Sequence, residues 1–180
     1  MARLPYVAED VSKEAESAFR LLAKMGRRPA NLYRLLANQP PALEAFLNMS
    51  AYVRGGSSLD PGLRELAILA TAYEFEQQYE IAHHVVAARE AGVPPERVRA
   101  VESGDLDALS PAEAAVVRFS REVARSRRCE DATFGAVLAA LGAAGAIDLT
   151  LTVGWYHLCA VVLDTHQVEI DDWLTRGPGL

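Results

Sequence analysis

Helix-start signals recur along this chain, each followed by apolar residues at helical spacing, and they constrain its fold more than any other feature. Asp60-Pro61 fits the N-cap and first position of a helix, because aspartate accepts free backbone N–H groups and proline lacks one. Ser110 and Glu113 have the spacing of a capping box. No segment shows the alternating pattern of a strand bounded by hairpin turns. The sequence therefore predicts an all-α fold.

Glycines and prolines divide the chain into successive helices. Whether the helix that starts at Asp60 breaks near Gln77 or continues is left open by the sequence. Gly142 and Gly145 separate the last two expected helices. The pattern predicts helices at about residues 11–25, 32–37, 43–54, 79–91, 95–101, 110–125, 131–141 and 147–166, and one that starts at residue 60 and covers at least residues 63–71.

Length and charge limit what the chain can be. Its 180 residues, 51% of them hydrophobic, predict one domain over residues 1–180, with a core at 59–101 and a helical N-terminal extension at 1–56. Lys and Arg total 18 against 24 for Asp and Glu, which gives a formal charge of -6. This charge argues against nucleic acid as a partner, because phosphate backbones attract basic surfaces.

The termini and the apolar segments predict a cytoplasmic protein without a membrane partner. The segment that follows Met1 lacks the apolar run of a signal peptide. The longest apolar region, residues 149–163, is shorter than the roughly 20 residues that span a bilayer. It is typical of a buried core helix.

Two cysteines, Cys129 and Cys159, lie far apart in the sequence and form no C-x-x-C motif. They predict two unpaired thiols and no dithiol redox motif. Cys129 follows Arg125, Arg127 and Arg128, and cationic neighbours favour a thiolate. Cys159 lies in an apolar helix, where core packing is expected.

Ionisable side chains are concentrated at residues 77–84, in the middle of the chain. On a helix, Gln77, Glu80 and His84 share one face. A glutamate four residues before a histidine can hold the imidazole ready for proton transfer near neutral pH. The competing interpretation is a solvent-facing pair worth about 0.3–0.5 kcal/mol. His84 shares its helix face with Ala87, Ala88 and Ala91, and such small residues allow close helix packing. This predicts that His84 points inward and that His83 lies nearer the surface.

Glutamate and histidine at this spacing can also ligate zinc or iron, but a metal site needs further ligands. His157 and His166 have no spacing that selects a metal. No phosphate loop, dinucleotide fingerprint or hydrolase motif is present in the sequence. We therefore expect no metal.

The runs 64–69, 79–85 and 88–93 resemble the carboxymuconolactone decarboxylase and alkylhydroperoxidase D superfamily. The family's common central form is Tyr-Glu-Trp-x-x-His, and Ile81 takes the place of the tryptophan here. Residues 3–6, 33–38 and 154–172 resemble the longer members more weakly. The resemblance implies an alkylhydroperoxidase D-like helical bundle that assembles as a homo-oligomer: a dimer, trimer or hexamer.

The superfamily's peroxidase branch uses a C-x-x-C-x-x-x-H motif and a glutamate on the preceding helix. By resemblance, His84 matches the histidine and Glu65 the upstream glutamate. The cysteine positions fall on Gln77 and Glu80, so the dithiol mechanism is absent.

The decarboxylase branch is similar in having Glu-x-x-x-His, matched by Glu80 and His84. Its substrate is a carboxylated lactone from aromatic catabolism, and its chemistry needs no metal or organic cofactor. This chain differs in its longer N-terminal part and in lacking a Gly-Val-Pro segment in its last helix.

The leading hypothesis is therefore a cofactor-independent lyase or isomerase that performs acid–base chemistry on a small carboxylated or carbonyl-bearing molecule. We expect His84 to be the principal proton shuttle, Glu80 to be its partner or a second acid or base, and Glu65 to be an outer relay. Candidate substrate-binding residues are Tyr79, His83 and Gln77.

Two other hypotheses remain open. The first is an alkylhydroperoxidase-like, peroxide-detoxifying protein that uses Cys129 or Cys159 by another route. The second is a non-catalytic helical assembly or binding module, which predicts that Glu80 and His84 are solvated and that no pocket lies beside them.

Overall fold

The computed structural model describes residues 1–8 and 13–175, and these contain helices and no strand, which confirms the all-α prediction. Residues 11 and 12, where the first helix was expected to begin, lie outside the described part. The helices are α1 (Lys13–Lys24), α2 (Asn31–Leu36), α3 (Pro40–Ala51), the π-helix η1 (Tyr52–Gly56), α4 (Pro61–Glu74), α5 (Gln78–Glu90), α6 (Pro95–Ser103), the 3-10 helix η2 (Leu106–Ala108), α7 (Pro111–Ser126), α8 (Asp131–His166) and α9 (Asp172–Thr175).

The chain divides into two compact units. We call residues 57–161 the central unit, and residues 1–56 with 162–180 the terminal unit. The predicted N-terminal extension, residues 1–56, ends where the central unit begins. The prediction of one domain over the whole chain stays a prediction.

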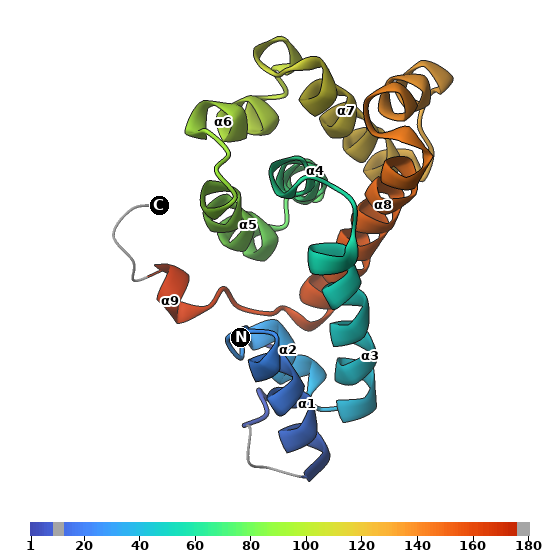
Figure 1. Cartoon of the computed structure of the whole chain (residues 1–180). Helices are drawn as coiled ribbons and strands as arrows, with labels where there is room; N and C mark the ends of the chain where they lie inside the picture. The colour runs from blue at the N-terminus through green and yellow to red at the C-terminus, as the bar shows by residue number, and fades with distance from the viewer. Residues whose placement is uncertain (9–12, 176–180) are drawn as a thin grey trace. The chain divides into compact units, whose positions relative to one another are not determined.

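Helix α4 lies in the middle of the central unit, with α5, α6, α7 and the central-unit part of α8 around it (Figure 1). Every residue from Glu65 to Ala72 is buried. One side of α4 packs through Ala67 on α7 and α8, and the other packs through Leu66 and Leu69 on α5, α6 and α7. A helix surrounded in this way can place a side chain in the interior.

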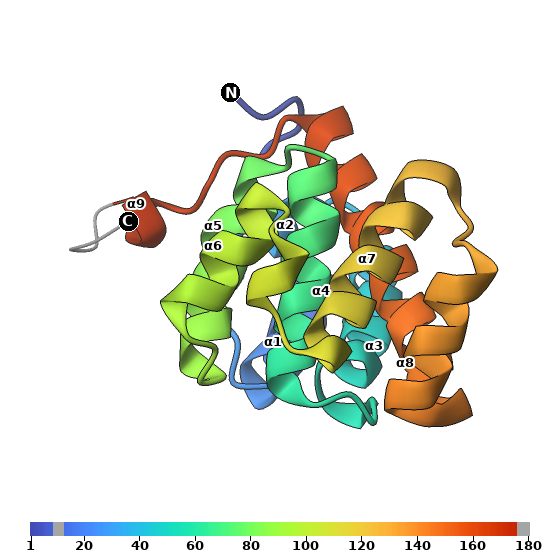
Figure 2. The same cartoon turned by 90° about the horizontal axis from the view of Figure 1, so that it is seen from above.

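The terminal unit has its own core, in which Phe19 and Leu22 of α1 pack with Leu43 and Leu47 of α3. A backbone hydrogen bond joins its two sequence-distant parts. The N–H of Arg3 donates to the carbonyl of His166 at 2.9 Å, at the end of α8 where the N-terminal segment lies in Figure 2.

Both predicted caps are confirmed. The carboxylate of Asp60 accepts the N–H groups of Gly62 and Leu63 at 2.9 and 3.2 Å, and α4 begins at Pro61. The N–H of Ser110 donates to the Glu113 carboxylate at 2.7 Å, which starts α7 as a capping box.

Helices α4 and α5 are separate, and the break lies at Glu76, whose φ of 54° is in the left-handed region. The N–H of Gln77 donates to the carbonyl of Ala72 at 2.9 Å, and that of Glu76 donates to Tyr73 at 3.2 Å. These bonds form a Schellman motif, which usually has glycine at the left-handed position. The strained glutamate turns the chain so that α5 returns along α4.

The last two expected helices form one element, α8, which is interrupted at Gly142 (φ 68°) and continues through Gly145. By length and composition α8 could cross a membrane, unlike the shorter apolar segment considered from sequence, although 39% of its most apolar stretch is buried within the protein. The helix after Gly142 contributes Leu149 and Val153 to the core of the central unit.

Candidate functional site

A carboxylate of α4 and an imidazole of α5 meet inside the central unit. The Nδ1 of His84 lies 2.6 Å from Oε2 of Glu65, a short hydrogen bond between side chains 19 residues apart in sequence. Glu65 is 2% exposed and His84 6% exposed. Burial of two ionisable groups is costly unless they are paired, so this contact is the feature that most demands a chemical explanation.

The other carboxylate oxygen of Glu65 faces a cation. The Nε and Nη2 atoms of Arg64 lie 3.4 Å from Oε1. The side chain of Arg64 is 13% exposed, so this guanidinium lies at the edge of the buried pair. Glu65 is thus placed between an imidazole and a guanidinium.

Helix α8 supplies the aromatic wall of the site. The ring of Tyr156 lies edge-on to the His84 imidazole, with centroids 4.8 Å apart and planes at 90°. Tyr156 is 5% exposed. Sequence reasoning did not select Tyr156 as a site residue. The aromatic run at residues 155–157 inside an apolar helix was the available signal, but spacing cannot show which distant residue it contacts.

The structure places Glu65, which we expected to be an outer relay, in direct contact with His84. Glu80, the expected partner, is buried at 3% exposure one helical turn before His84. His84 is buried, as its alanine neighbours predicted. The burial of both residues contradicts the solvated pair that the non-catalytic hypothesis predicted.

The three candidate substrate-binding residues lie at the start of α5 and one turn beyond. The side-chain oxygen of Gln77 accepts the N–H of Tyr79 at 2.8 Å, so Gln77 caps α5. The ring of Tyr79 stacks on that of His83, with centroids 4.5 Å apart and planes at 28°. His83 is half-buried and His84 buried, in the order expected. Substrate contact by these residues stays a prediction.

The environment of Cys129 differs from the one that its arginine neighbours suggested. Burial raises the pKa of the Cys129 thiol, and the carboxylate of Glu122 raises it further. The expectation that this cysteine favours a thiolate is therefore wrong. The nearby arginines Arg125, Arg127 and Arg128 are exposed, where solvent screens their charge. Cys159 is buried in α8.

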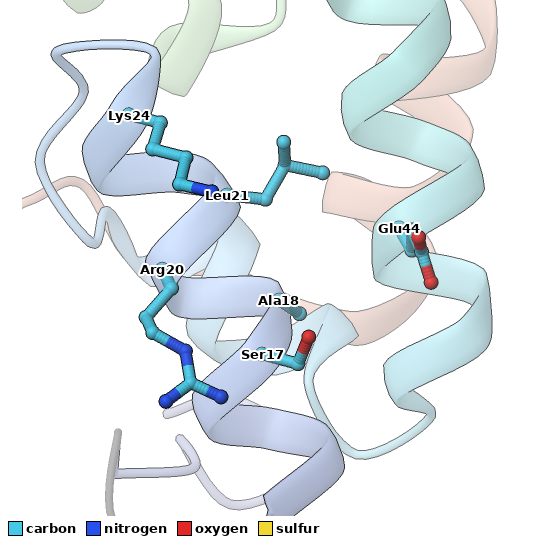
Figure 3. Close-up of a pocket in the computed structure, with 6 residues that line it drawn as sticks. All are labelled: Ser17, Ala18, Arg20, Leu21, Lys24 and Glu44. Carbon is cyan, nitrogen blue, oxygen red and sulfur yellow. The ribbon is translucent and has the colours of Figure 1, made fainter.

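Two further observations concern ligands. Among the described residues no group of three His, Cys, Asp or Glu side chains is placed to hold a metal ion. A hollow of about 210 Å³ lies in the terminal unit between α1 and α3 (Figure 3). Its charged side chains, Arg20, Lys24 and Glu44, are exposed, and Arg20 already pairs with Glu16 at 2.8 Å. No buried polar side chain among the described residues lines this hollow, so we do not consider it a candidate binding site.

Residues 40–122, which include Glu65, Glu80 and His84, match the model of the carboxymuconolactone decarboxylase family. The match covers 83 of the 180 residues and includes the core expected at residues 59–101. It confirms the resemblance seen in the sequence to the carboxymuconolactone decarboxylase family. No curated protein sequence matches the chain.

Solved structures share the fold over nearly the whole chain. An AhpD-core, peroxidase-related protein from Ralstonia eutropha JMP134 has a TM-score of 0.79 and 20% identity, with 96% of this chain and 94% of that one covered. A peroxidase-related protein from Silicibacter sp. TM1040 has a TM-score of 0.83 and 16% identity, with 97% and 94% covered.

A variant of the debrominase Bmp8, in complex with 2,3,4-tribromopyrrole, has a TM-score of 0.81 and 14% identity, with 97% of this chain and 96% of that one covered. At these identities the likeness concerns the fold alone. The different descriptions of these neighbours indicate that one scaffold carries more than one activity.

Proposed function

We propose that this protein is a cofactor-independent enzyme that moves protons on a small carboxylated or carbonyl-bearing substrate, such as a lactone. The observation that carries the proposal is the buried hydrogen bond between Glu65 and His84. Enzymes that transfer protons near neutral pH use a histidine oriented by a carboxylate.

The hydrogen bond defines a role for each nitrogen of His84. When Nδ1 carries the proton and donates it to Glu65, Nε2 is left as the nitrogen that can accept a proton from substrate. Glu65 then stabilises the imidazolium that forms, without taking its proton. The guanidinium of Arg64, 3.4 Å from the other carboxylate oxygen, adds a positive charge beside Glu65. We assign Glu65 as the orienting partner of His84 and Glu80 as a second acid or base.

In a proton shift, the C–H bond next to a carbonyl breaks, Nε2 takes the proton, and the electron pair forms an enolate. His84 then returns the proton to another carbon. In a decarboxylation, the bond to the carboxylate breaks, carbon dioxide leaves, and the electron pair again forms an enolate. A proton that reaches His84 from solvent completes the product. Both routes balance without an oxidant or reductant.

The alternative peroxide chemistry has weaker support. Two neighbours are described as peroxidase-related, but Gln77 and Glu80 occupy the dithiol positions that the resemblance implies. The pKa of Cys129 is raised, so little of it is thiolate at neutral pH. A peroxide consumption assay with a thiol donor decides between the two: loss of a wild-type activity in Cys129→Ser/Cys159→Ser supports the peroxide route.

The test of the acid–base proposal does not require the natural substrate in advance. The protein is incubated in D₂O with a panel of carboxylated lactones and β-keto acids, and NMR follows deuterium incorporation and loss of the carboxyl group. We expect catalysis with at least one compound and its loss in His84→Ala. The matched control is His166→Ala, which removes a histidine in the terminal unit and should retain activity. Equal activity in His84→Ala and wild type would overturn the assignment.

A further inference from the structure

The proposed chemistry gives no role to Tyr156 of α8, although its ring contacts the imidazole that we assign to proton transfer. The ring centroids of Tyr156 and His84 lie 4.8 Å apart, and the two ring planes are perpendicular, at 90°. Both side chains are buried, so the contact is made in the interior of the central unit. Perpendicular aromatic pairs at this separation attract each other in a defined geometry.

The hydrogen bond between Glu65 and His84 fixes one atom of the imidazole but not its plane. It joins Nδ1 of His84 to Oε2 of Glu65 at 2.6 Å. Hydrogen bonds to a carboxylate accept a broad range of directions, and the terminal torsion of a histidine side chain has broad minima. The imidazole can therefore tilt about this contact. Such a tilt moves Nε2, the nitrogen that takes the proton from substrate.

The ring of Tyr156 supplies the constraint that the hydrogen bond lacks. In a close-packed interior, a ring that stands perpendicular to the imidazole blocks rotation about the Cβ–Cγ bond of His84, because a large rotation drives one ring into the other. Three helices then define the imidazole. Helix α5 carries it, α4 holds Nδ1 through Glu65, and α8 holds its plane through Tyr156.

The position of Tyr156 is itself fixed by its neighbours on α8. The next residue, His157, packs against Phe75 at the end of α4, with ring centroids 4.6 Å apart and planes at 62°. About one turn earlier, Val153 packs in the core of the central unit. Consecutive residues of α8 therefore contact both helices that build the site, which fixes the register of Tyr156 against His84.

We infer that Tyr156 is a positioning residue, whose ring holds the plane of the His84 imidazole and thereby keeps Nε2 in one direction. The inference rests on the proposed function, because it gives Tyr156 a part in the proton transfer by His84. It extends the site to α8, beyond residues 40–122 that match the family model. Misplacement of a reacting group by about 1 Å can cost about 10²-fold in rate, so the effect should fall on kcat.

The first experiment measures kcat and KM on the substrate found by deuterium exchange. Tyr156→Phe keeps the ring and should retain nearly the wild-type kcat. Tyr156→Leu removes the ring, and its kcat should fall about 10–100-fold with little change in KM. Tyr156→Met, whose flexible side chain fills more of the space, replaces it if Tyr156→Leu does not fold.

The matched control is Phe119→Leu. Phe119 lies on α7, is 3% exposed and belongs to the core of the central unit, so the control also removes a buried ring. We expect it to lose stability and to keep the wild-type kcat. A loss of kcat in Phe119→Leu as large as that in Tyr156→Leu would overturn the inference, because general loosening of the core would then explain both.

The second experiment needs no substrate. NMR relaxation of protein with ¹³C-labelled histidine gives the order parameter of the His84 ring, whose signal is assigned by its loss in His84→Ala. We expect about 0.85, the value of a rigid group, in wild type, Tyr156→Phe and Phe119→Leu, and a fall below about 0.6 in Tyr156→Leu. A role of Tyr156 in stability alone would not move this value in the folded protein.

The outcomes separate this inference from the proposed function. Wild-type kcat in Tyr156→Leu, with His84→Ala inactive, overturns the inference alone, and so does an unchanged order parameter of His84 in Tyr156→Leu. A kcat loss in Tyr156→Phe equal to that in Tyr156→Leu also overturns it, because the hydroxyl and not the ring would then act. Wild-type activity in His84→Ala overturns the proposed function instead, and the order parameters still decide whether Tyr156 holds the ring.

Discussion

The α4–α5 site buries ionisable side chains, whereas the outer face of α8 exposes apolar ones. At the α4–α5 site, Glu65, Glu80 and His84 are buried. On α8, Ile147 and Leu158 are exposed. Most charged residues lie outside and most large aliphatic residues inside, so each region departs from the arrangement that stability alone favours.

The two regions therefore need separate explanations. Burial of a glutamate and a histidine costs desolvation free energy, which their mutual hydrogen bond has to offset. An exposed apolar row costs little in the single chain but invites association. We therefore propose a reaction at the buried α4–α5 site and an association at the exposed face of α8. The following predictions, from the largest effect to the smallest, test whether the two regions differ in this way.

We expect the largest effect when a second carboxylate is introduced on α4, one helical turn after Glu65. Leu69 is fully buried on α4, and Leu69→Glu should lower the free energy of unfolding by about 4 kcal/mol or more, because no imidazole or guanidinium is provided there. Urea denaturation of Leu69→Glu and wild type measures this loss of unfolding free energy. A loss below about 1 kcal/mol would show that α4 tolerates carboxylates generally and that Glu65 is not special.

The guanidinium beside Glu65 should have an intermediate effect. Arg64→Met keeps the aliphatic stem but removes the charge next to a buried carboxylate, and should cost about 1–2 kcal/mol of unfolding free energy. The matched control is Arg20→Met, whose partner Glu16 is nearer, at 2.8 Å, but exposed. It should cost less than about 0.5 kcal/mol. Equal losses from the two variants would contradict the importance of burial.

A leucine-to-glutamate substitution on the exposed face of α8 should hardly change the stability of the monomer. Leu158→Glu, measured by urea denaturation at a protein concentration where wild type is monomeric, should change the free energy of unfolding by no more than about 0.5 kcal/mol. A loss comparable to that of Leu69→Glu would mean that Leu158 supports the fold and does not serve association.

The smallest effect is expected at Cys129, a half-buried thiol with a raised pKa. A raised pKa means less thiolate at neutral pH, so iodoacetamide should label Cys129 more slowly than an unstructured thiol at pH 7.5 and faster as the pH rises. Mass spectrometry with Cys129→Ser as the reference measures the rate. Rapid labelling at neutral pH would favour a peroxide-reactive cysteine.

Local signals made much of this fold predictable. The caps at Asp60 and Ser110 act within four residues of chain, so their sequences suffice to place the starts of α4 and α7. Alanines next to His84 correctly indicated its burial. The break before α5 could not be placed, because the left-handed residue is Glu76, where glycine would have been the usual signal.

Helical spacing could not predict which residue hydrogen-bonds to His84. The i,i+4 rule selects residues on one helix, so it offered Glu80, whereas the hydrogen bond crosses to Glu65 on α4. The kink in α8 shows a similar limit. Gly142 and Gly145 look alike in sequence, but only Gly142 leaves the helix. A Cβ at the buried Gly145 would lie 2.6 Å from that of Leu141, so packing explains its glycine.

The most direct test of the central claim is a double-mutant cycle on kcat/KM, with the substrate found by deuterium exchange. The variants are Glu65→Gln, His84→Ala and the two combined. If Glu65 acts only through His84, each single variant should lose about 10²–10⁴-fold, and the double variant should be no slower than the worse single one. Losses that multiply would contradict a coupled pair, and wild-type turnover in His84→Ala would remove the histidine from the mechanism.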